Sequence, residues 1–175
     1  MCSFYSCSEP ELNNPFSDGG EIPPDVTITD SALRFYPLYK EVSTSSQFTM
    51  DIYVDIDSED VPVPSLIGAE IEFTYDKSLV SFDMAEKGAK LSSLDDILIQ
   101  EDDTETGSVR ITLATALDDG AGITGSGSLV QVSFTPLTSG SFELDLSASS
   151  LFIKNYTPNS STSFSSLINA TIVIE

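Results

Sequence analysis

The sequence predicts an all-β fold, a two-sheet antiparallel sandwich of about nine or ten short strands. Three observations carry this prediction. Apolar and polar residues alternate in at least five segments, as in residues 48–56, which gives strands one buried and one exposed face. Clusters of Gly, Pro, Asn, Asp and Ser separate these segments. No long run of residues shows the helical period.

The first expected strand, residues 33–39, is interrupted by Pro37, which favours an edge position because proline has no N–H to donate. The second, residues 48–56, places its apolar side chains on one face and its acidic ones on the other. Residues 66–76 and 79–84 are the next two strands, joined by a turn at residues 76–78. The later expected strands are residues 97–99, 108–115, 129–135, 142–146, 151–153 and 171–174.

The chain divides into an N-terminal tether and one domain. Residues 1–29 are rich in Pro, Gly, Ser and Asn with little apolar periodicity, so we expect a flexible linker there. Residues 30–175 are expected to form the sandwich. We recognise no signal peptide and no segment apolar enough to span a bilayer. Cys2 is a lipid-attachment candidate; the alternative is an incidental cysteine in the tether.

The composition excludes several classes of function. The net charge is −21 at pH 7, which disfavours nucleic acid and anionic membranes as partners. The acidity favours solubility, with a saline habitat or a basic partner as alternatives. The 175 residues include no histidine, so they cannot supply Ser-His-Asp or Cys-His catalysis. Two thiols, at Cys2 and Cys7, and no histidine do not suffice for a zinc site.

The order of strand and turn motifs resembles the cohesin family. Residues 67–76, with Leu79, Phe82 and Gly88 after them, match one cohesin element, and residues 125–134 match a later one. The resemblance covers roughly residues 33–175 and departs from the family after residue 151, where a long Ser/Thr/Asn stretch precedes the last strand.

This resemblance implies a nine-stranded jelly-roll sandwich with no enzymatic activity. It implies a module that captures a dockerin module of another protein, mainly with one flat sheet face. Such modules assemble polysaccharide-degrading complexes or fix proteins at the cell surface, so an extracellular or cell-surface location is expected. The alternative class is a carbohydrate-binding β-sandwich module.

Two acidic clusters are candidates for a calcium site, as an alternative to a protein-binding face. Calcium binds several carboxylate oxygens on a flexible loop, and no other cofactor is expected. The candidate clusters are Asp55, Asp57, Glu59 and Asp60, and Asp95, Asp96, Glu101, Asp102, Asp103 and Glu105. Solvated acidic loops are the alternative. Four tyrosines are candidates for stacking on sugars in a chain that lacks tryptophan: Tyr36, Tyr39, Tyr53 and Tyr75.

Strand alternation also sorts the outward residues of three strands. These residues are small and polar or charged, as suits a flat hydrogen-bonding surface, and the resemblance implies that the dockerin-contacting face lies on these strands. The expected partner-binding residues are Gly68, Glu70, Glu72, Thr74, Arg110, Thr112, Gln131 and Ser133.

Overall fold

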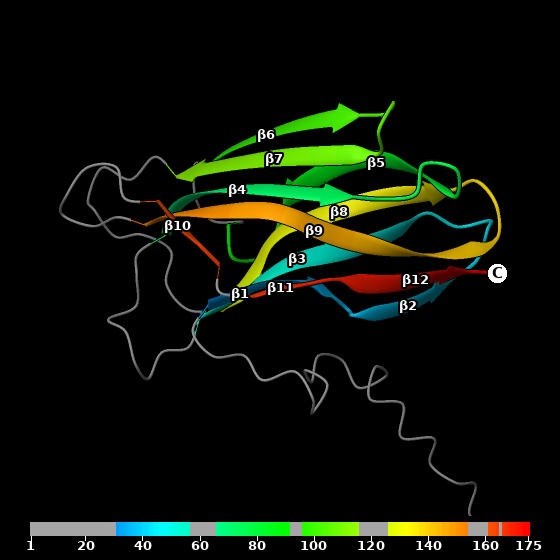
Figure 1. Cartoon of the computed structure of the whole chain (residues 1–175), viewed down its shortest axis with the longest axis horizontal. Coiled ribbons are helices and arrows are strands. Elements are labelled where there is room, and N and C mark those ends of the chain that lie inside the picture. The colour runs from blue at the N-terminus through cyan, green and yellow to red at the C-terminus, as the bar shows by residue number, and fades with distance from the viewer. Residues whose placement is uncertain (1–30, 57–65, 92–95, 116–125, 154–160, 165) are drawn as a thin grey trace, which may run out of the picture.

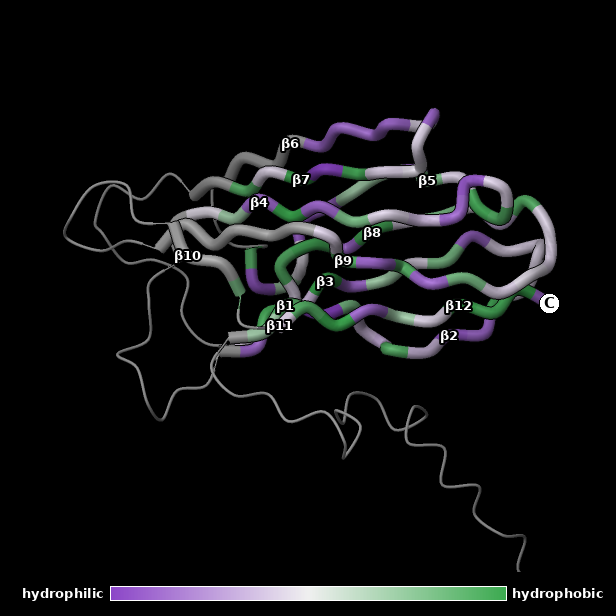
Figure 2. The backbone as a smooth tube through the Cα atoms, in the orientation of Figure 1, coloured by the Kyte–Doolittle hydropathy of each residue, from purple (hydrophilic) through white to green (hydrophobic). Residues whose placement is uncertain are grey.

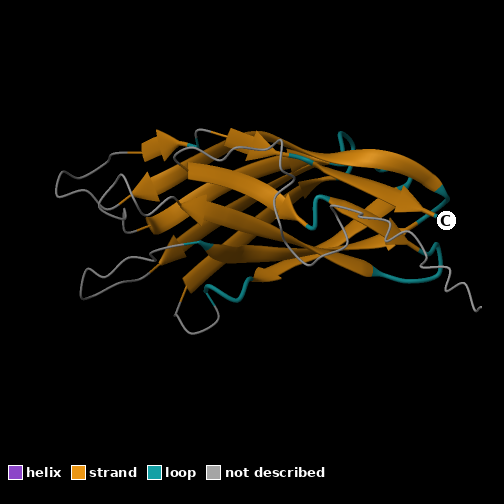
Figure 3. Cartoon of the chain, turned by 90° about the horizontal axis from the view of Figure 1, so that it is seen from below, coloured by secondary structure: helices purple, strands orange, loops and turns teal. Residues whose placement is uncertain are grey.

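The computed structural model describes residues 31–56, 66–91, 96–115, 126–153, 161–164 and 166–175. The expected tether, with Cys2 and Cys7, lies outside these residues. Within them the chain forms twelve strands and no helix, and Figure 3 shows the strands in two layers. The all-β sandwich predicted from the sequence is therefore confirmed.

One layer is a five-stranded sheet. In spatial order its strands are β11 (Ser166–Ile168), β1 (Ser31–Tyr36), β3 (Phe48–Ile56), β8 (Gly127–Pro136) and β5 (Val80–Lys87). The β1–β11 pair is parallel, and the other neighbours are antiparallel.

The other layer is a seven-stranded sheet, which includes β6, β7 and β4 in the upper part of Figure 1. In spatial order its strands are β2 (Tyr39–Val42), β12 (Ala170–Ile174), β9 (Gly140–Ile153), β4 (Leu66–Thr74), β7 (Ser108–Thr115) and β6 (Asp96–Asp103), with β10 (Ser161–Ser163) beside β9.

Several strand boundaries differ from the sequence-based expectation. Pro37 divides residues 33–39 into β1 and β2, which join opposite sheets; β2 is an edge strand, whereas β1 lies between β11 and β3. The two strands expected at residues 142–146 and 151–153 are one strand, β9, because its serine-rich middle also pairs with β4, with a register shift between Glu72 and Phe73. β10 and β11 were missed because their short serine-containing segments show no alternation.

The core lies between the sheets, and alternation fills it as predicted. Along β3, the side chains of Phe48, Met50, Ile52 and Val54 are buried. Figure 2 shows this alternation as hydrophobic and hydrophilic segments that follow one another along the strands. Because one face of each strand is committed to the core, the opposite face is available for polar and charged residues.

An aromatic cluster joins the two sheets. Phe73 of β4 makes an edge-on contact with Phe35 of β1, with ring centroids 5.4 Å apart, and a second with Phe134 of β8 at 6.3 Å. Phe134 also contacts Phe82 of β5 at 5.7 Å and stacks on Phe48 at 5.4 Å. One aromatic residue of the seven-stranded sheet is thus held by the sheet opposite, which fixes the orientation of β4.

A buried ion pair holds β1 against β3 on the outer side of the five-stranded sheet. Arg34 Nε donates to Asp55 Oδ2 at 2.6 Å, and the two side chains are 6% and 16% exposed. The Arg34 guanidinium carbon also lies 4.6 Å from the ring centroid of Tyr53 and 5.5 Å from that of Tyr36. The charge is therefore matched by one carboxylate and two aromatic faces.

We predict that Asp55→Ala destabilises the protein by about 3–5 kcal/mol, because Arg34 then remains buried without its carboxylate. Chemical denaturation measures the change. The matched control is Glu72→Ala, which removes a carboxylate from a half-exposed pair with Arg110 and should cost about 0–1 kcal/mol. Equal losses in the two variants would show that the Arg34 pair contributes no more than a surface contact.

Candidate functional site

The outer surface of β9, β4, β7 and β6 carries most of the charged side chains on the seven-stranded sheet; we call this surface the acidic face. Its outward residues alternate with buried ones such as Ile71 and Ile111. The acidic face consists of Glu143, Asp145 and Ser147 on β9, Glu70, Glu72 and Thr74 on β4, Ser108, Arg110 and Thr112 on β7, and Glu101 and Asp103 on β6. These residues comprise six carboxylates and one cation.

Strand register brings the charged residues into rows. Glu72 lies directly opposite Arg110 in the β4–β7 pair, and Arg110 lies directly opposite Glu101 in the β7–β6 pair. Directly opposed residues on one face of an antiparallel pair have neighbouring side chains. The charge therefore alternates along the row across β4, β7 and β6: Glu72 is negative, Arg110 is positive and Glu101 is negative.

Arg110 is held loosely by two carboxylates of β4. Its Nη2 donates to Glu72 Oε2 at 3.4 Å, and its Nε lies 3.5 Å from Glu70 Oε1. The Arg110 side chain is 50% exposed, and those of Glu70 and Glu72 are 45% and 31% exposed. Exposed pairs of this length contribute about 0–1 kcal/mol to stability, so their geometry is free to change when another charged group approaches.

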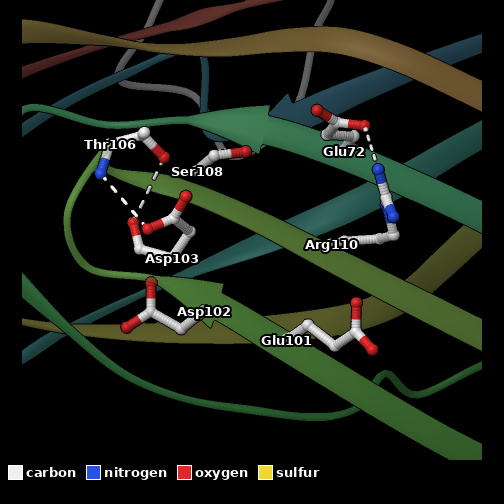
Figure 4. Close-up of a pocket in the computed structure, with 7 residues that line it drawn as sticks. All are labelled: Glu72, Glu101, Asp102, Asp103, Thr106, Ser108 and Arg110. Carbon is white, nitrogen blue, oxygen red and sulfur yellow. Dashed lines mark hydrogen bonds and ion pairs between the residues drawn. The ribbon is translucent and has the colours of Figure 1, made fainter.

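A shallow depression of about 520 Å³ lies on the acidic face where β6 turns into β7. Figure 4 shows its lining, with Arg110 extended toward Glu72 and the acidic side chains of β6 beside it. The lining residues are Glu72, Glu101, Asp102, Asp103, Thr106, Ser108 and Arg110. The depression is polar and open to solvent, which suits the side chain of a partner rather than an enclosed small molecule.

The turn after β6 is closed by Asp103 and Gly107. The Asp103 carboxylate accepts hydrogen bonds from the backbone N–H groups of Glu105 at 3.0 Å and Thr106 at 3.4 Å. Hydrogen bonds from Thr106 and Glu105 hold the pKa of Asp103 below its usual value. Gly107 has φ +72°, which a residue with a side chain rarely adopts, and its carbonyl accepts from Tyr75 N–H at 2.9 Å. The turn thus fixes the end of the acidic face.

Tyr75 and Asp102 form a polar contact on the inner side of this turn. Tyr75 Oη donates to Asp102 Oδ1 at 3.2 Å. Burial, followed by the charge of Asp102, raises the pKa of Tyr75 to about 12. Burial also raises the pKa of Asp102, although the hydrogen bond from Tyr75 opposes that rise. The tyrosine is therefore held as a neutral donor.

We predict that Tyr75 makes the protein lose stability as the pH rises from about 10 to about 12. In that range the unfolded chain releases the phenol proton near pH 10.0, while the folded chain retains it up to about pH 12. The folded state binds the extra proton, so the free energy of unfolding falls with rising pH. Urea denaturation across this range measures the slope, and Tyr75→Phe should make it shallower. An unchanged slope in the variant would contradict this assignment.

The structure brings six of the eight expected partner-binding residues onto one sheet and separates the other two. Gly68 is buried; Glu70, Glu72, Thr74, Arg110 and Thr112 are among the outward residues of β4 and β7. Gln131 and Ser133 lie on β8, in the opposite sheet, and Ser133 is 8% exposed. The expectation of one common face is therefore wrong for those two residues. Alternation tells which side of a strand is buried but not which sheet the strand joins.

The sequence-based prediction also missed carboxylates on neighbouring strands. Glu143 and Asp145 alternate with buried Phe142, Leu144 and Leu146, so their outward direction was readable from the sequence. For Glu101 and Asp103 the sequence predicts only a possible role as metal ligands. Their place on the acidic face follows from the β6–β7 pairing, which the sequence does not reveal.

The outer side of the five-stranded sheet is built differently. Tyr36 and Tyr53 pack on Arg34, with their ring centroids 6.3 Å apart. Ser128 Oγ donates to Asp51 Oδ1 at 2.6 Å on the same side. Of the other tyrosines considered for sugar stacking, Tyr75 is 7% exposed and Tyr39 Oη donates to Glu41 Oε1 at 2.6 Å. These rings are thus engaged in contacts within the protein.

Among the described residues, no group of three or more acidic, cysteine or histidine side chains is placed to hold a metal ion. Asp55 of the first calcium candidate pairs with Arg34. Asp57, Glu59, Asp60 and Asp95 lie outside the described residues. The described part of the chain also contains no helix long and apolar enough to cross a membrane.

This chain matches known proteins by its structure and not by its sequence. No protein-family model matches the sequence, and no curated protein matches it significantly. Among solved structures, the sixth cohesin of scaffoldin B from Acetivibrio cellulolyticus, solved in complex with a Cel5 dockerin, aligns with a TM-score of 0.64 and 13% identity. That alignment covers 84% of this chain and 100% of the cohesin.

Two further cohesins come from other settings. A non-cellulosomal cohesin from the archaeon Archaeoglobus fulgidus has a TM-score of 0.62 and 14% identity, over 84% of this chain and 92% of that one. A cohesin module of a family 33 glycoside hydrolase from Clostridium perfringens has a TM-score of 0.60 and 18% identity, over 86% and 100%. At identities this low, structural similarity shows the fold alone. The chain has the jelly-roll β-sandwich fold of cohesin modules.

Proposed function

We propose that this chain is a non-catalytic protein-binding module that captures a dockerin-type partner on its acidic face. One observation carries the proposal: the described strands match whole cohesin modules, including one that was solved with a dockerin bound. The proposed partner is a protein module and not a nucleic acid, because phosphates would be repelled by a net charge of −21.

The acidic face is favoured over the opposite sheet because its side chains are available. Its central ion pairs are 3.4–3.5 Å long and half-exposed, whereas Arg34 on the other sheet is buried against two tyrosines. A partner docking on the acidic face has to rearrange only weak contacts. A partner docking around Arg34 would have to disturb a buried ion pair.

The proposed setting is extracellular or at the cell surface, in an assembly of polysaccharide-degrading proteins. Support comes from the cohesin-type fold and from the module of this fold in a glycoside hydrolase of Clostridium perfringens. A lipid anchor at Cys2 would attach the module to a membrane through the tether. Mass spectrometry of the protein from its native membrane fraction tests that attachment.

We predict that Glu70→Lys with Glu72→Lys weakens binding of a dockerin at least about tenfold, or about 1.4 kcal/mol. Both side chains point outward, so the fold should survive, and the reversal removes charges that attract basic partner groups. Isothermal titration calorimetry against a panel of calcium-loaded dockerin modules measures the affinities.

The matched control is Asp83→Lys with Glu86→Lys, which makes the same change in charge on exposed positions of β5 in the other sheet. It should leave the affinity within about twofold, because rim and remote charges mainly change association rate and salt dependence. The assignment of the binding face is refuted if this control abolishes binding while the β4 variant binds normally.

Retardation by a polysaccharide in affinity electrophoresis, without binding to any dockerin, would favour a carbohydrate-binding module instead.

A further inference from the structure

The charge pattern of the acidic face specifies the partner in more detail, and this inference rests on the proposed function. We propose that Arg110 is a specificity-determining residue that requires one acidic side chain within an otherwise basic contact surface of the partner.

Arg110 is the one cation of the acidic face. Arg110 lies on β7, between β4 on one side and β6 on the other. It faces Glu72 across one strand pair and Glu101 across the next. Adjacent strands lie about 4.8 Å apart, so one partner side chain can reach Arg110 while its neighbours reach the flanking carboxylates. Figure 4 shows these three residues side by side.

Negative charge predominates on the acidic face. Six carboxylates share the acidic face with one guanidinium, so most of the face attracts cations. A partner with Lys or Arg side chains at the matching positions gains from each carboxylate. If every contact of the partner were basic, one cation would lie against Arg110, and juxtaposed like charges at an interface are unfavourable.

Arg110 is able to pair with a carboxylate of the partner. Guanidinium carries five N–H donors in a planar fork, and the contacts to Glu70 and Glu72 are 3.4–3.5 Å long. Half of the side chain is exposed. A carboxylate of the partner can therefore pair with the exposed part of the fork, with geometry that lysine would not reproduce.

The test is a display library built on a calcium-loaded dockerin scaffold, with its exposed contact positions randomised among Lys, Glu and Gln. Selection against this protein should enrich binders that carry one Glu among several Lys. Binders from that pool should lose about tenfold or more in affinity for Arg110→Glu and regain it when their Glu is changed to Lys. Arg110→Lys should retain the preference for Glu with weaker binding. Thermal unfolding first establishes that each variant is folded.

The control is Lys87→Glu, an equal reversal at an exposed position of β5 in the opposite sheet, which should not alter the selected charges. Binders enriched in Lys alone, or equal affinity for the wild-type protein and Arg110→Glu, would overturn the role of Arg110 while leaving dockerin binding intact. If no member of the library binds, while a cohesin–dockerin pair of known structure is recovered in parallel, the proposed function fails and this inference fails with it.

Discussion

The aromatic contact between the two sheets is the constraint on which the candidate site depends. Phe73 of β4 meets Phe35 of β1 and Phe134 of β8 across the core. With Phe73 and Ile71 fixed inward, the pleat of β4 sends Glu70 and Glu72 to the opposite side. A shift of β4 by one residue would exchange these sets and bury two carboxylates, at a cost far above any surface contact. The charge pattern on the acidic face is therefore a consequence of core packing.

Pairing between strands, rather than alternation within them, creates the site. β5 separates β4 from β6 and β7 in the sequence, and the register of the three strands places Glu72, Arg110 and Glu101 in one row. The outer sides of the two sheets differ in how their charges are matched. Arg34 is buried with Asp55 between two tyrosines, whereas Arg110 is half-exposed between carboxylates in weak contacts. The same residue type thus stabilises the fold on one sheet and is available for recognition on the other.

The fold class was predictable because period-2 alternation is a local signal, and most strands were located from it. The outward direction of Glu70, Glu72, Arg110 and Thr112 was predictable for the same reason. The sheet to which β8 belongs was not, since it is set by non-local pairing with β3 and β5, and the grouping of Gln131 and Ser133 with the β4 residues was accordingly wrong. The acidic run of β6 was ambiguous for a related reason. Its carboxylates differ from a metal loop only through their pairing with β7.

Binding of a dockerin-type module to the acidic face should change the surroundings of the residues on that face. Chemical-shift mapping by nuclear magnetic resonance tests it most directly, with isotope-labelled protein and an unlabelled calcium-loaded dockerin that binds it. The largest changes should fall on outward residues of β9, β4, β7 and β6, with Arg110 among them. Changes concentrated on β1, β3 and β8, around Arg34 and Tyr53, would contradict it.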